Sequence, residues 1–254
     1  MPEGDTLYNT ALTLRPALLG EALTGVNVRS RGMYRLRVGD TVRSVEAVGK
    51  FLEIVVERGL ALRTHLHMTG VWHLYEQGER WRKPRHLARA VLETESHVAV
   101  CFAAPTVEVG PAADDRLAHL GPDLCLEDVD LDAVMRRVAD ADQTVEIAEV
   151  LLDQRLAAGI GNVYKNEVLW ACELSPFRPL AEVNDELRRR LYETAAQQLQ
   201  ANLGRWKRQT HPKGLAVYDR AGQGCYRCFT RIRTVEHGAI GRRTWWCPSC
   251  QPRD

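Results

Sequence analysis

The sequence predicts an α+β protein with more than one domain, on the basis of three observations. Short apolar runs separated by glycines fill residues 24–110, which is typical of antiparallel strands joined by tight turns. Helical spacing of apolar residues precedes this region and returns after residue 144. Four cysteines near the end of the chain are spaced as two metal-binding pairs. At 254 residues, the chain is long enough for one large domain or two ordinary ones.

The first elements in chain order are a helix and a set of strands. Residues 3–19 are expected to form a helix because apolar residues recur every three or four positions from Leu7 to Leu18, and Gly20 provides a C-terminal stop. Alternating apolar runs such as 52–56 and 98–102 follow. Many short strands with regular turns predict an antiparallel sandwich or barrel.

The later elements are predicted to be mostly helical. Residues 111–143 are mixed and acidic, and we expect a connection there with a short helix near 130–139. The next helical patterns cover residues 145–156, 163–171 and 184–203, and a glycine-containing turn separates the first two.

The cysteine hairpin that closes the chain carries the strongest chemical signal. Eighteen residues separate the pair Cys225 and Cys228 from the pair Cys247 and Cys250, a spacing that lets four thiolates enclose one tetrahedral Zn²⁺. An ion with four protein ligands has no open position, so its expected role is to stabilise the hairpin. Two disulfides, or a staple with no further role, are the alternatives. Between the pairs, arginines outnumber the single acid Glu236, which points toward nucleic acid.

Charge is unevenly distributed although the formal net charge is only +1. Residues 1–150 carry 17 basic and 23 acidic side chains, whereas residues 151–254 carry 17 basic and 10 acidic ones. The basic second part is suited to bind a polyanion. No apolar stretch approaches the roughly 20 residues of a membrane span, and the first residues fit neither a signal nor a transit peptide. We therefore expect a cytoplasmic protein with no membrane partner.

The N-terminal residues form a second chemical candidate. Pro2 is small enough for removal of Met1, which would leave a secondary amine that is partly unprotonated at neutral pH. Such an amine can attack an aldehyde or a sugar C1′ carbon to give an iminium ion, and Glu3 places a carboxylate beside it. The alternative is an ordinary Met-Pro-Glu start without chemistry.

The turn at residues 158–162 is a third candidate. Backbone N–H groups at a helix start, together with Asn162, suit a contact with phosphate. An ordinary tight turn is the alternative, because Gly-Ile-Gly-Asn has no other special chemistry.

Taken in order, the motifs of the chain resemble those of the Fpg/Nei family, which contains formamidopyrimidine-DNA glycosylase and endonuclease VIII. The resemblance runs from residue 1 to residue 251, and the start and the segment before Cys225 are most similar to the actinobacterial subgroup of endonuclease VIII. The matching segments are Met1–Gly4, Val48–Lys50, His65–Gly70, Gly121–Asp123, Leu152–Gln154, Gly159–Asn162 with Glu167, Val217–Gly222 and the hairpin that ends at Gln251.

The resemblance implies a helix-capped N-terminal β-sandwich, a helix–two-turn–helix domain with the zinc hairpin, and DNA in the cleft between them. The implied bounds are 1–130 for the catalytic domain, 131–143 for a linker, 144–220 for the helix–two-turn–helix domain and 221–254 for the zinc finger.

The family's catalytic residues map onto four positions. Pro2 would attack C1′ and expel the base with Glu3 as acid, and Lys50 would assist β-elimination. Arg242 would contact phosphate and take part in δ-elimination. A solvated strand residue is the alternative for Lys50, and Arg243 is the alternative for Arg242 because the hairpin is longer than the family usually has.

The family's DNA contacts map onto four further positions. Asn162 corresponds to a phosphate contact, and His119 stands where endonuclease VIII often has an arginine that contacts phosphate. His67 and Met68 fall in the loop that fills the gap left by the flipped base, where an apolar tip can act as a wedge. A buried core methionine is the alternative for Met68.

Two departures bear on the branch of the family. Residues 112–119 lack the aromatic wedge of the formamidopyrimidine branch, which favours the endonuclease VIII branch and oxidised pyrimidines as substrates. At Asp5-Thr6 the chain lacks the glutamate that many relatives have at position 6, so one part of the catalytic hydrogen-bond network differs.

The resemblance therefore implies a bifunctional DNA glycosylase and abasic-site lyase that acts by β,δ-elimination. Its partner would be double-stranded DNA with oxidised bases or abasic sites, and also single-stranded or bubble DNA. We expect a monomer with one structural Zn²⁺ and no organic cofactor. The alternatives are a formamidopyrimidine/8-oxoguanine glycosylase and a non-catalytic zinc-ribbon DNA-binding protein.

Overall fold

The computed structural model describes residues 2–30, 32–238 and 240–252, and the chain divides into two compact units. The first unit contains Pro2 and Thr6–His119, and the second contains Glu3–Asp5 and the chain from Leu120 onward. Met1, whose removal the sequence predicts, lies outside the described residues. In the described part of the chain, no helix is long and apolar enough to cross a membrane.

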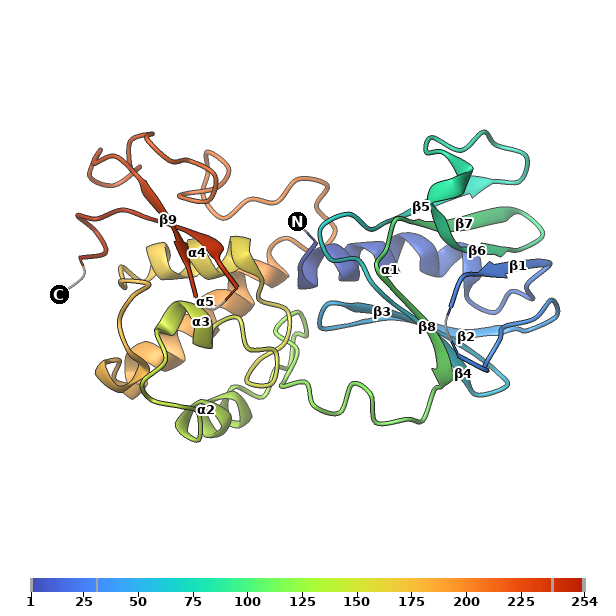
Figure 1. Ribbon diagram of the computed structural model, residues 1–254, viewed down its shortest axis with the longest axis horizontal. Helices are drawn as coiled ribbons and strands as arrows, with labels where there is room; N and C mark the ends of the chain where they lie inside the picture. The colour runs from blue at the N-terminus through green and yellow to red at the C-terminus, as the bar shows by residue number, and fades with distance from the viewer. Residues whose placement is uncertain (1, 31, 239, 253–254) are drawn as a thin grey trace. The chain divides into compact units, whose positions relative to one another are not determined.

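The first unit is the predicted antiparallel β-sandwich (Figure 1). One sheet has the strand order β1-β6-β7-β5 and the other has the order β2-β3-β4-β8, and neighbouring strands are antiparallel. The strands are β1 Gly25–Val28, β2 Val42–Val48, β3 Phe51–Val56, β4 Leu60–His65, β5 Val71–Glu76, β6 Ala88–Glu93, β7 His97–Phe102 and β8 Thr106–Pro111, and the 3₁₀ turn η1 Arg85–Leu87 precedes β6.

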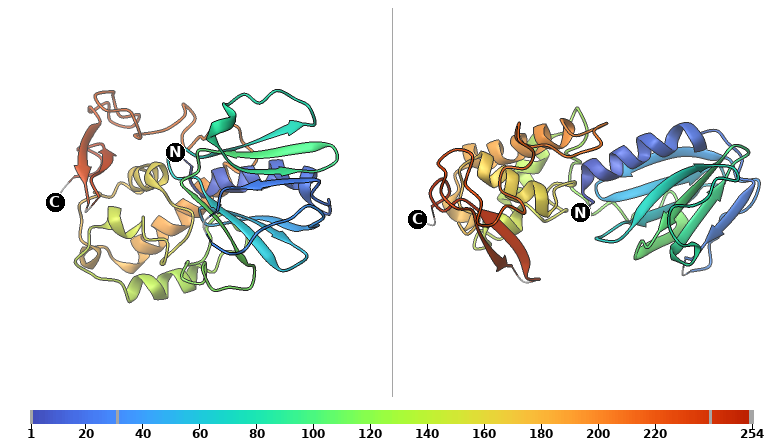
Figure 2. Two further views of the ribbon diagram at one scale, coloured as in Figure 1. Left: turned by 45° about the vertical axis from the view of Figure 1, so that its right-hand side comes forward. Right: turned by 90° about the horizontal axis from the view of Figure 1, so that it is seen from above.

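Helix α1 Gly4–Leu18 runs alongside the two sheets, as Figure 2 shows. Leu7 and Leu14, at the predicted helical spacing, are 1% exposed and belong to the same core cluster as Leu52 and Ile54 of β3. Side chains alternate along a strand, so Glu53 lies on the opposite face of β3 from these two residues. The apolar faces of the helix and the strand thus pack together in one core.

The second unit is mostly helical, and its helices lie close to those expected. They are α2 Leu131–Ala139, α3 Ile147–Val150, α4 Asn162–Ala171 and α5 Asp185–Gln200, with the 3₁₀ turn η2 Leu180–Glu182. Every residue of α4 from Asn162 to Trp170 is buried. The side chain of Asn184 caps α5 by accepting a hydrogen bond from the Leu187 N–H group at 2.9 Å.

The predicted helix over 145–156 is wrong in length, because α3 ends at Val150. Beyond it, the Asp153 N–H group bonds to the Val150 carbonyl three residues back, as in a 3₁₀ turn. The Asp153 side chain then accepts a hydrogen bond from the Arg155 N–H group at 2.9 Å, which competes with helical hydrogen bonding. Apolar spacing alone does not reveal this competition.

Residues 131–143, for which the resemblance implied a linker, contain α2, which confirms the short helix expected near 130–139. Asp132 of α2 forms an ion pair with Arg189 of α5 at 2.7 Å, so this segment packs on the second unit. The expected domain bounds stay a prediction.

The C-terminal hairpin consists of β9 Arg233–His237 and β10 Arg242–Trp246, paired antiparallel. Its Ile232 and Trp245 share an apolar cluster with Trp170 of α4 and with Val217. Two of the four paired cysteines, Cys225 and Cys247, are buried in the same cluster. Packing against α4 therefore holds the hairpin in place, in addition to the pairing of its own two strands.

Candidate functional site

The Glu3 carboxylate is buried and closes the N-terminus of α4. Its oxygens accept hydrogen bonds from the backbone N–H groups of Gly161 (2.9 Å), Val163 (2.7 Å) and Tyr164 (3.2 Å), and the residue is 0% exposed. The first N–H groups of a helix have no partners within the helix, so a negative side chain satisfies them and interacts favourably with the helix dipole. Glu3 is therefore fixed in place, with Pro2 directly before it in the chain.

Gly161 provides the space that this carboxylate occupies. A Cβ atom at position 161 would lie only 2.4 Å from the Glu3 Cδ atom. The Gly161 φ of −120° is accessible to any residue, so the close approach, not the backbone conformation, requires glycine. The Gly4 N–H group also donates to the Gly159 carbonyl at 3.0 Å, which fixes the start of α1 to the same turn.

Asp5 forms a second buried carboxylate site, with Arg208 and Tyr164. Its carboxylate accepts hydrogen bonds from Arg208 Nε at 2.7 Å and from the Tyr164 hydroxyl at 2.9 Å, and it is 4% exposed. The Arg208 guanidinium also lies over the Tyr164 ring, 4.8 Å from its centroid. Position 5 thus supplies a paired carboxylate in a chain that has threonine at position 6.

Two asparagines of α4 hold the hairpin strand β10. The Asn162 Nδ2 atom donates to the Arg243 carbonyl at 2.9 Å, and the Asn166 Oδ1 atom accepts from the Trp245 N–H group at 2.8 Å. Asn162 is 7% exposed, and its buried Oδ1 atom has no hydrogen-bond partner among the described residues. Asn162 therefore connects the turn that binds Glu3 with the strand that carries Arg242.

The register of β10 separates the two candidate arginines. Arg242 lies on the same strand face as Thr244, and Arg243 lies on the other face because side chains alternate. Thr244 is fully buried, and its hydroxyl accepts a hydrogen bond from Lys165 Nζ of α4 at 2.7 Å. Arg242 thus shares its strand face with the residue that bonds to Lys165 and is half-buried, whereas Arg243 is exposed. The assignment of Arg242 as the functional arginine stays a prediction.

Lys165 is a buried residue that the sequence analysis missed. It is 0% exposed, and burial lowers the pKa of its amine to about 8, while Glu149 and Glu3 oppose the shift and Arg242 adds to it. The hydroxyl of its partner Thr244 also lies 3.2 Å from His237 Nδ1. Lysine in a helical pattern usually lies in solvent, so only the packing of α4 against β10 identifies this residue.

In the first unit, Lys50 lies in the two-residue turn that joins β2 and β3, where Val48 pairs with Phe51. Phe51 in turn pairs with His65 at the end of β4, and their rings meet edge to face with centroids 4.9 Å apart. Burial first, and then the positive charges of His67 and Lys50, lower the pKa of His65 to about 4. His65 is therefore neutral at neutral pH and adds no charge beside Lys50.

The loop after β4 carries the two predicted wedge residues. The His67 ring lies 4.1 Å from the His65 ring by centroids, and the His67 φ of 48° lies in the left-handed region. Met68 is 68% exposed, so the alternative of a buried core methionine is wrong. The structure thus brings His67 and Met68 to the same end of the sheet as Lys50.

Pro2 and His119 are the first and last described residues of the first unit along the chain. Pro2 is half-buried, and His119 is exposed in a turn. Of the predicted residues, the structure thus groups Glu3, Asn162 and Arg242 in the second unit and the others in the first, apart from the cysteines.

The segment that lacks an aromatic wedge is held by ion pairs instead. Arg116 pairs with Asp114 at 3.1 Å and with Glu108 of β8. Asp114 also pairs at 2.8 Å with Arg63 of β4, which is 4% exposed and bonds to Glu53. This network fixes residues 114–116 against the sheet.

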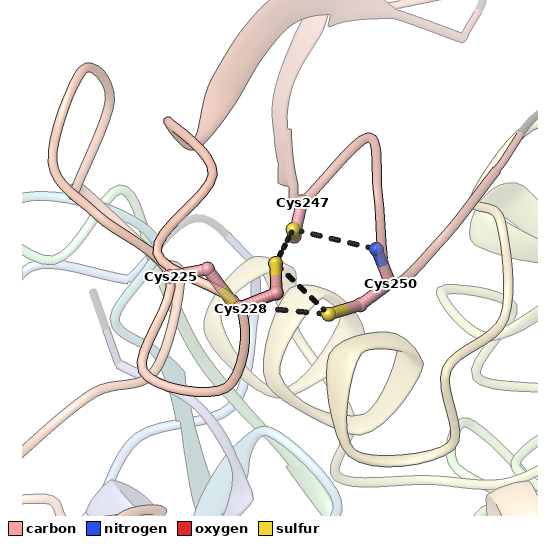
Figure 3. A group of neighbouring side chains, drawn as sticks. All are labelled: Cys225, Cys228, Cys247 and Cys250. Atoms are coloured by element: carbon pink, nitrogen blue, oxygen red, sulfur yellow. Dashed lines mark hydrogen bonds between the residues drawn. The ribbon is translucent and has the colours of Figure 1, made fainter.

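The four hairpin cysteines converge, as Figure 3 shows, with all four Sγ atoms within 4.8 Å of one another. The separations are 3.9 Å for Cys225 and Cys250 and 3.4 Å for Cys228 with either Cys247 or Cys250. A tetrahedral ion with bonds of about 2.3 Å to sulfur requires Sγ atoms about 3.8 Å apart. A disulfide requires about 2.0 Å, so the alternative of two disulfides does not fit.

Nearby donors support thiolates at this cluster. The Cys225 Sγ atom accepts hydrogen bonds from the Trp170 indole at 3.3 Å and from the Arg227 N–H group at 3.4 Å. The Cys247 Sγ atom accepts one from the Cys250 N–H group at 3.4 Å. Such bonds orient and stabilise sulfur ligands of a metal ion.

The two units match two parts of one protein architecture. Residues 1–106 match the formamidopyrimidine-DNA glycosylase N-terminal domain, and residues 120–212 match the formamidopyrimidine-DNA glycosylase H2TH domain. The solved structure of MutM (Fpg) from Thermus thermophilus has a TM-score of 0.81 to this chain at 30% identity, with 100% of both chains covered. The fold and the cysteine hairpin therefore define an Fpg-like protein.

Two curated relatives place the chain within this class. "Probable endonuclease 8 2" of Streptomyces coelicolor is 38% identical, with 99% of this chain and 94% of that protein covered. "DNA-(apurinic or apyrimidinic site) lyase Nei2" of Mycolicibacterium smegmatis is 37% identical, with 99% of both covered. The chain belongs to the Fpg/Nei family, in its endonuclease VIII branch.

Proposed function

We propose that this protein is a base-excision repair DNA glycosylase with abasic-site lyase activity, which removes oxidised pyrimidines. The observation that carries the proposal is the buried Glu3 carboxylate, bound by three N–H groups of α4 directly after Pro2. This arrangement fixes an acid/base group next to a nucleophile, as covalent catalysis requires. The names of the relatives, an endonuclease 8 and a lyase for abasic sites, support it.

The proposed reaction starts from the free Pro2 amine. Its nitrogen bonds to C1′ while the bond from C1′ to the base breaks. The attack leaves a proton on the Pro2 nitrogen. The N–H donors around Glu3 favour its carboxylate form, so Glu3 accepts this proton and passes it to the departing base. The nitrogen lone pair then expels O4′ from C1′, which opens the sugar ring as O4′ takes a proton from water and leaves an iminium ion. The iminium ion draws electrons from C2′, and loss of a C2′ proton breaks the bond from C3′ to its phosphate oxygen. A second elimination releases the 5′ phosphate.

We assign the remaining predicted residues to the eliminations and to DNA. Lys50 assists the first elimination, and Arg242 contacts phosphate and assists the second. Asn162 and His119 contact the backbone of the DNA, and His67 and Met68 fill the gap left by the extruded base. The exposure of Met68 supports the wedge role.

We propose that the four cysteines bind one structural Zn²⁺. The Sγ separations and the hydrogen bonds to Cys225 and Cys247 support four thiolate ligands. The ion would hold the ends of the hairpin together, and the hairpin would present Arg242.

Borohydride reduction with abasic-site DNA tests the activity. Wild-type protein with a free Pro2 amine should form a stable covalent adduct, because borohydride reduces the iminium ion. A variant with one extra residue before Pro2 should bind the DNA without forming the adduct. If the wild-type protein binds abasic-site DNA but gives no adduct, it is the non-catalytic zinc-ribbon alternative.

A further inference from the structure

Hydrogen bonds close the neck of the loop that follows α5. Asn202, which is 1% exposed, donates from Nδ2 to the Gln209 carbonyl at 3.0 Å and accepts from the Gln209 N–H group at 2.7 Å. The same Nδ2 atom donates to the Gln198 carbonyl of α5 at 2.7 Å. This reciprocal pair of bonds holds the two ends of the loop together across six intervening residues.

Arg208 ties this loop to the residues around Glu3. Its guanidinium bonds to the buried Asp5 carboxylate, two residues beyond Glu3, and lies over the ring of Tyr164. The Tyr164 N–H group is itself a donor to the Glu3 carboxylate at 3.2 Å. The loop is thus attached to the same helical turn that fixes Glu3, within the second unit.

Trp206 lies at the tip of the loop with its side chain fully in solvent. Its exposure is 102%, whereas Trp72, Trp170, Trp245 and Trp246 are all 6–7% exposed. No hydrogen bond or ring contact in the described part of the chain involves the Trp206 side chain. A tryptophan exposed at the tip of an anchored loop is available for an intermolecular contact.

The surroundings of Trp206 indicate what it contacts. Arg205 and Lys207 flank it, both are exposed, and the last part of the chain from residue 201 carries 11 basic and 3 acidic side chains. An aromatic ring between two cations is the arrangement with which proteins stack on an unpaired base and neutralise the adjacent phosphates. Two residues span at most about 7 Å, so the tip stays close to the Arg208 anchor.

We propose that Trp206 is a base-stacking residue, which packs on an unpaired nucleobase of the DNA bound beside Glu3, with Arg205 and Lys207 on the flanking phosphates. The proposal rests on the proposed function, because it assigns a DNA contact to the same part of the second unit. It predicts that part of the affinity for DNA with unpaired bases comes from an uncharged stacking contact.

The test compares Trp206→Ala with Trp206→Phe, which keeps an aromatic face. Leu126→Ala serves as the control, since it removes a 51% exposed apolar side chain outside the loop. Binding is measured by fluorescence anisotropy with two probes, a duplex containing a tetrahydrofuran abasic analogue and single-stranded oligothymidylate. Trp206→Ala should bind both probes about tenfold more weakly, whereas Trp206→Phe and Leu126→Ala should stay near wild type.

The slope of affinity against salt should be unchanged in Trp206→Ala, because the substitution removes no charge. Oligothymidylate should also quench tryptophan emission in the wild type and quench it less in Trp206→Phe. Equal affinities of wild type and Trp206→Ala for both probes, with equal quenching, would overturn the proposal and leave the loop as a contact for another macromolecule.

Borohydride trapping separates this result from failure of the proposed function. An adduct from wild type and from Trp206→Ala at saturating abasic-site DNA, together with equal affinities, removes only the Trp206 proposal. Absence of an adduct from the wild type removes the glycosylase proposal, while the anisotropy and quenching data still decide whether Trp206 stacks on DNA.

Discussion

Glu3→Gln should reveal both the structural role of Glu3 and the chemical role that we propose for it. The amide NH₂ group cannot accept hydrogen bonds, so at least one N–H group at the start of α4 loses its partner. We expect the free energy of unfolding to fall by about 1–3 kcal/mol. Excision of thymine glycol should fall by about 100-fold or more. Urea unfolding and single-turnover excision measure the two effects.

Glu57→Gln is the matched control, because Glu57 is exposed in the turn after β3. It should leave both quantities unchanged. Wild-type excision by a folded Glu3→Gln protein would rule out Glu3 as the acid/base group.

Gly161→Ala should displace the Glu3 carboxylate without changing its chemistry. The added methyl group would lie 2.4 Å from Glu3 Cδ, although the backbone conformation suits alanine. We expect excision to fall with the unfolding free energy, by about 1–3 kcal/mol for the latter. A crystal structure of the variant with Glu3 in its original place would contradict this explanation.

Lys165 should make the stability of the protein depend on pH. The pKa of its amine is about 8 in the folded protein, compared with the ordinary lysine value of 10.5 that applies to the unfolded chain. Between these values the unfolded chain binds more protons, so stability rises as pH increases from 8 to 10.5. The difference in unfolding free energy between wild type and Lys165→Met should change in favour of wild type by about 3 kcal/mol across this range. Parallel pH profiles from urea unfolding would show that Lys165 does not titrate there.

Single residues differ in how far the sequence could predict them. Pro2 and Glu3 could be proposed as adjacent reactive groups, and the resemblance to the Fpg/Nei family favoured this over an ordinary chain start. The partners of Glu3 could not, since they are backbone N–H groups about 160 positions away. The Asp5–Arg208 pair spans a similar distance, and Lys165 is buried only because α4 has neighbours on every side. Each of these contacts depends on tertiary packing.

The two adjacent arginines of β10, Arg242 and Arg243, are expected to differ in their contribution to DNA binding. Arg242→Ala should weaken DNA binding and reduce the slope of log affinity against log salt by about one phosphate contact, because the proposed function assigns this contact to Arg242. Arg243→Ala is the matched control and should have a smaller effect. Both variants should retain stoichiometric zinc, as measured by metal analysis. An effect confined to Arg243→Ala would show that the expected register is off by one residue.

Secondary-structure elements were predictable where the apolar residues recur with a single period. The apolar spacing of α1 and α5 and the alternation of β3 lead to the observed elements. The sequence failed at α3, where Asp153 bonds to the backbone and the chain turns after four helical residues. The short helix expected near 130–139 corresponds to α2, which packs on α5 through Asp132.

At the scale of the whole protein, membership of the endonuclease VIII branch predicts which oxidised base is excised. Residues 114–116 are held to the sheet by ion pairs, and Met68 is the exposed apolar tip on the same unit. An apolar tip has little capacity to test the opposite base by hydrogen bonding. We expect thymine glycol to be excised in preference to 8-oxoguanine opposite cytosine. Competition between the two duplexes measures this, and preference for 8-oxoguanine would place the specificity with the formamidopyrimidine branch.

The two-part α+β architecture followed from the sequence because each part has its own apolar period and its own charge balance. The cysteine spacing likewise predicted the cluster that the structure contains. The chemistry proposed for this architecture depends on the nitrogen of one residue. Peptide mapping of the borohydride-trapped adduct therefore tests the central claim most directly. We predict that the reduced sugar is attached to the peptide that begins with Pro2, through its α-nitrogen. Attachment to a lysine, Lys50 or Lys165 included, would contradict the assignment of Pro2 as the nucleophile.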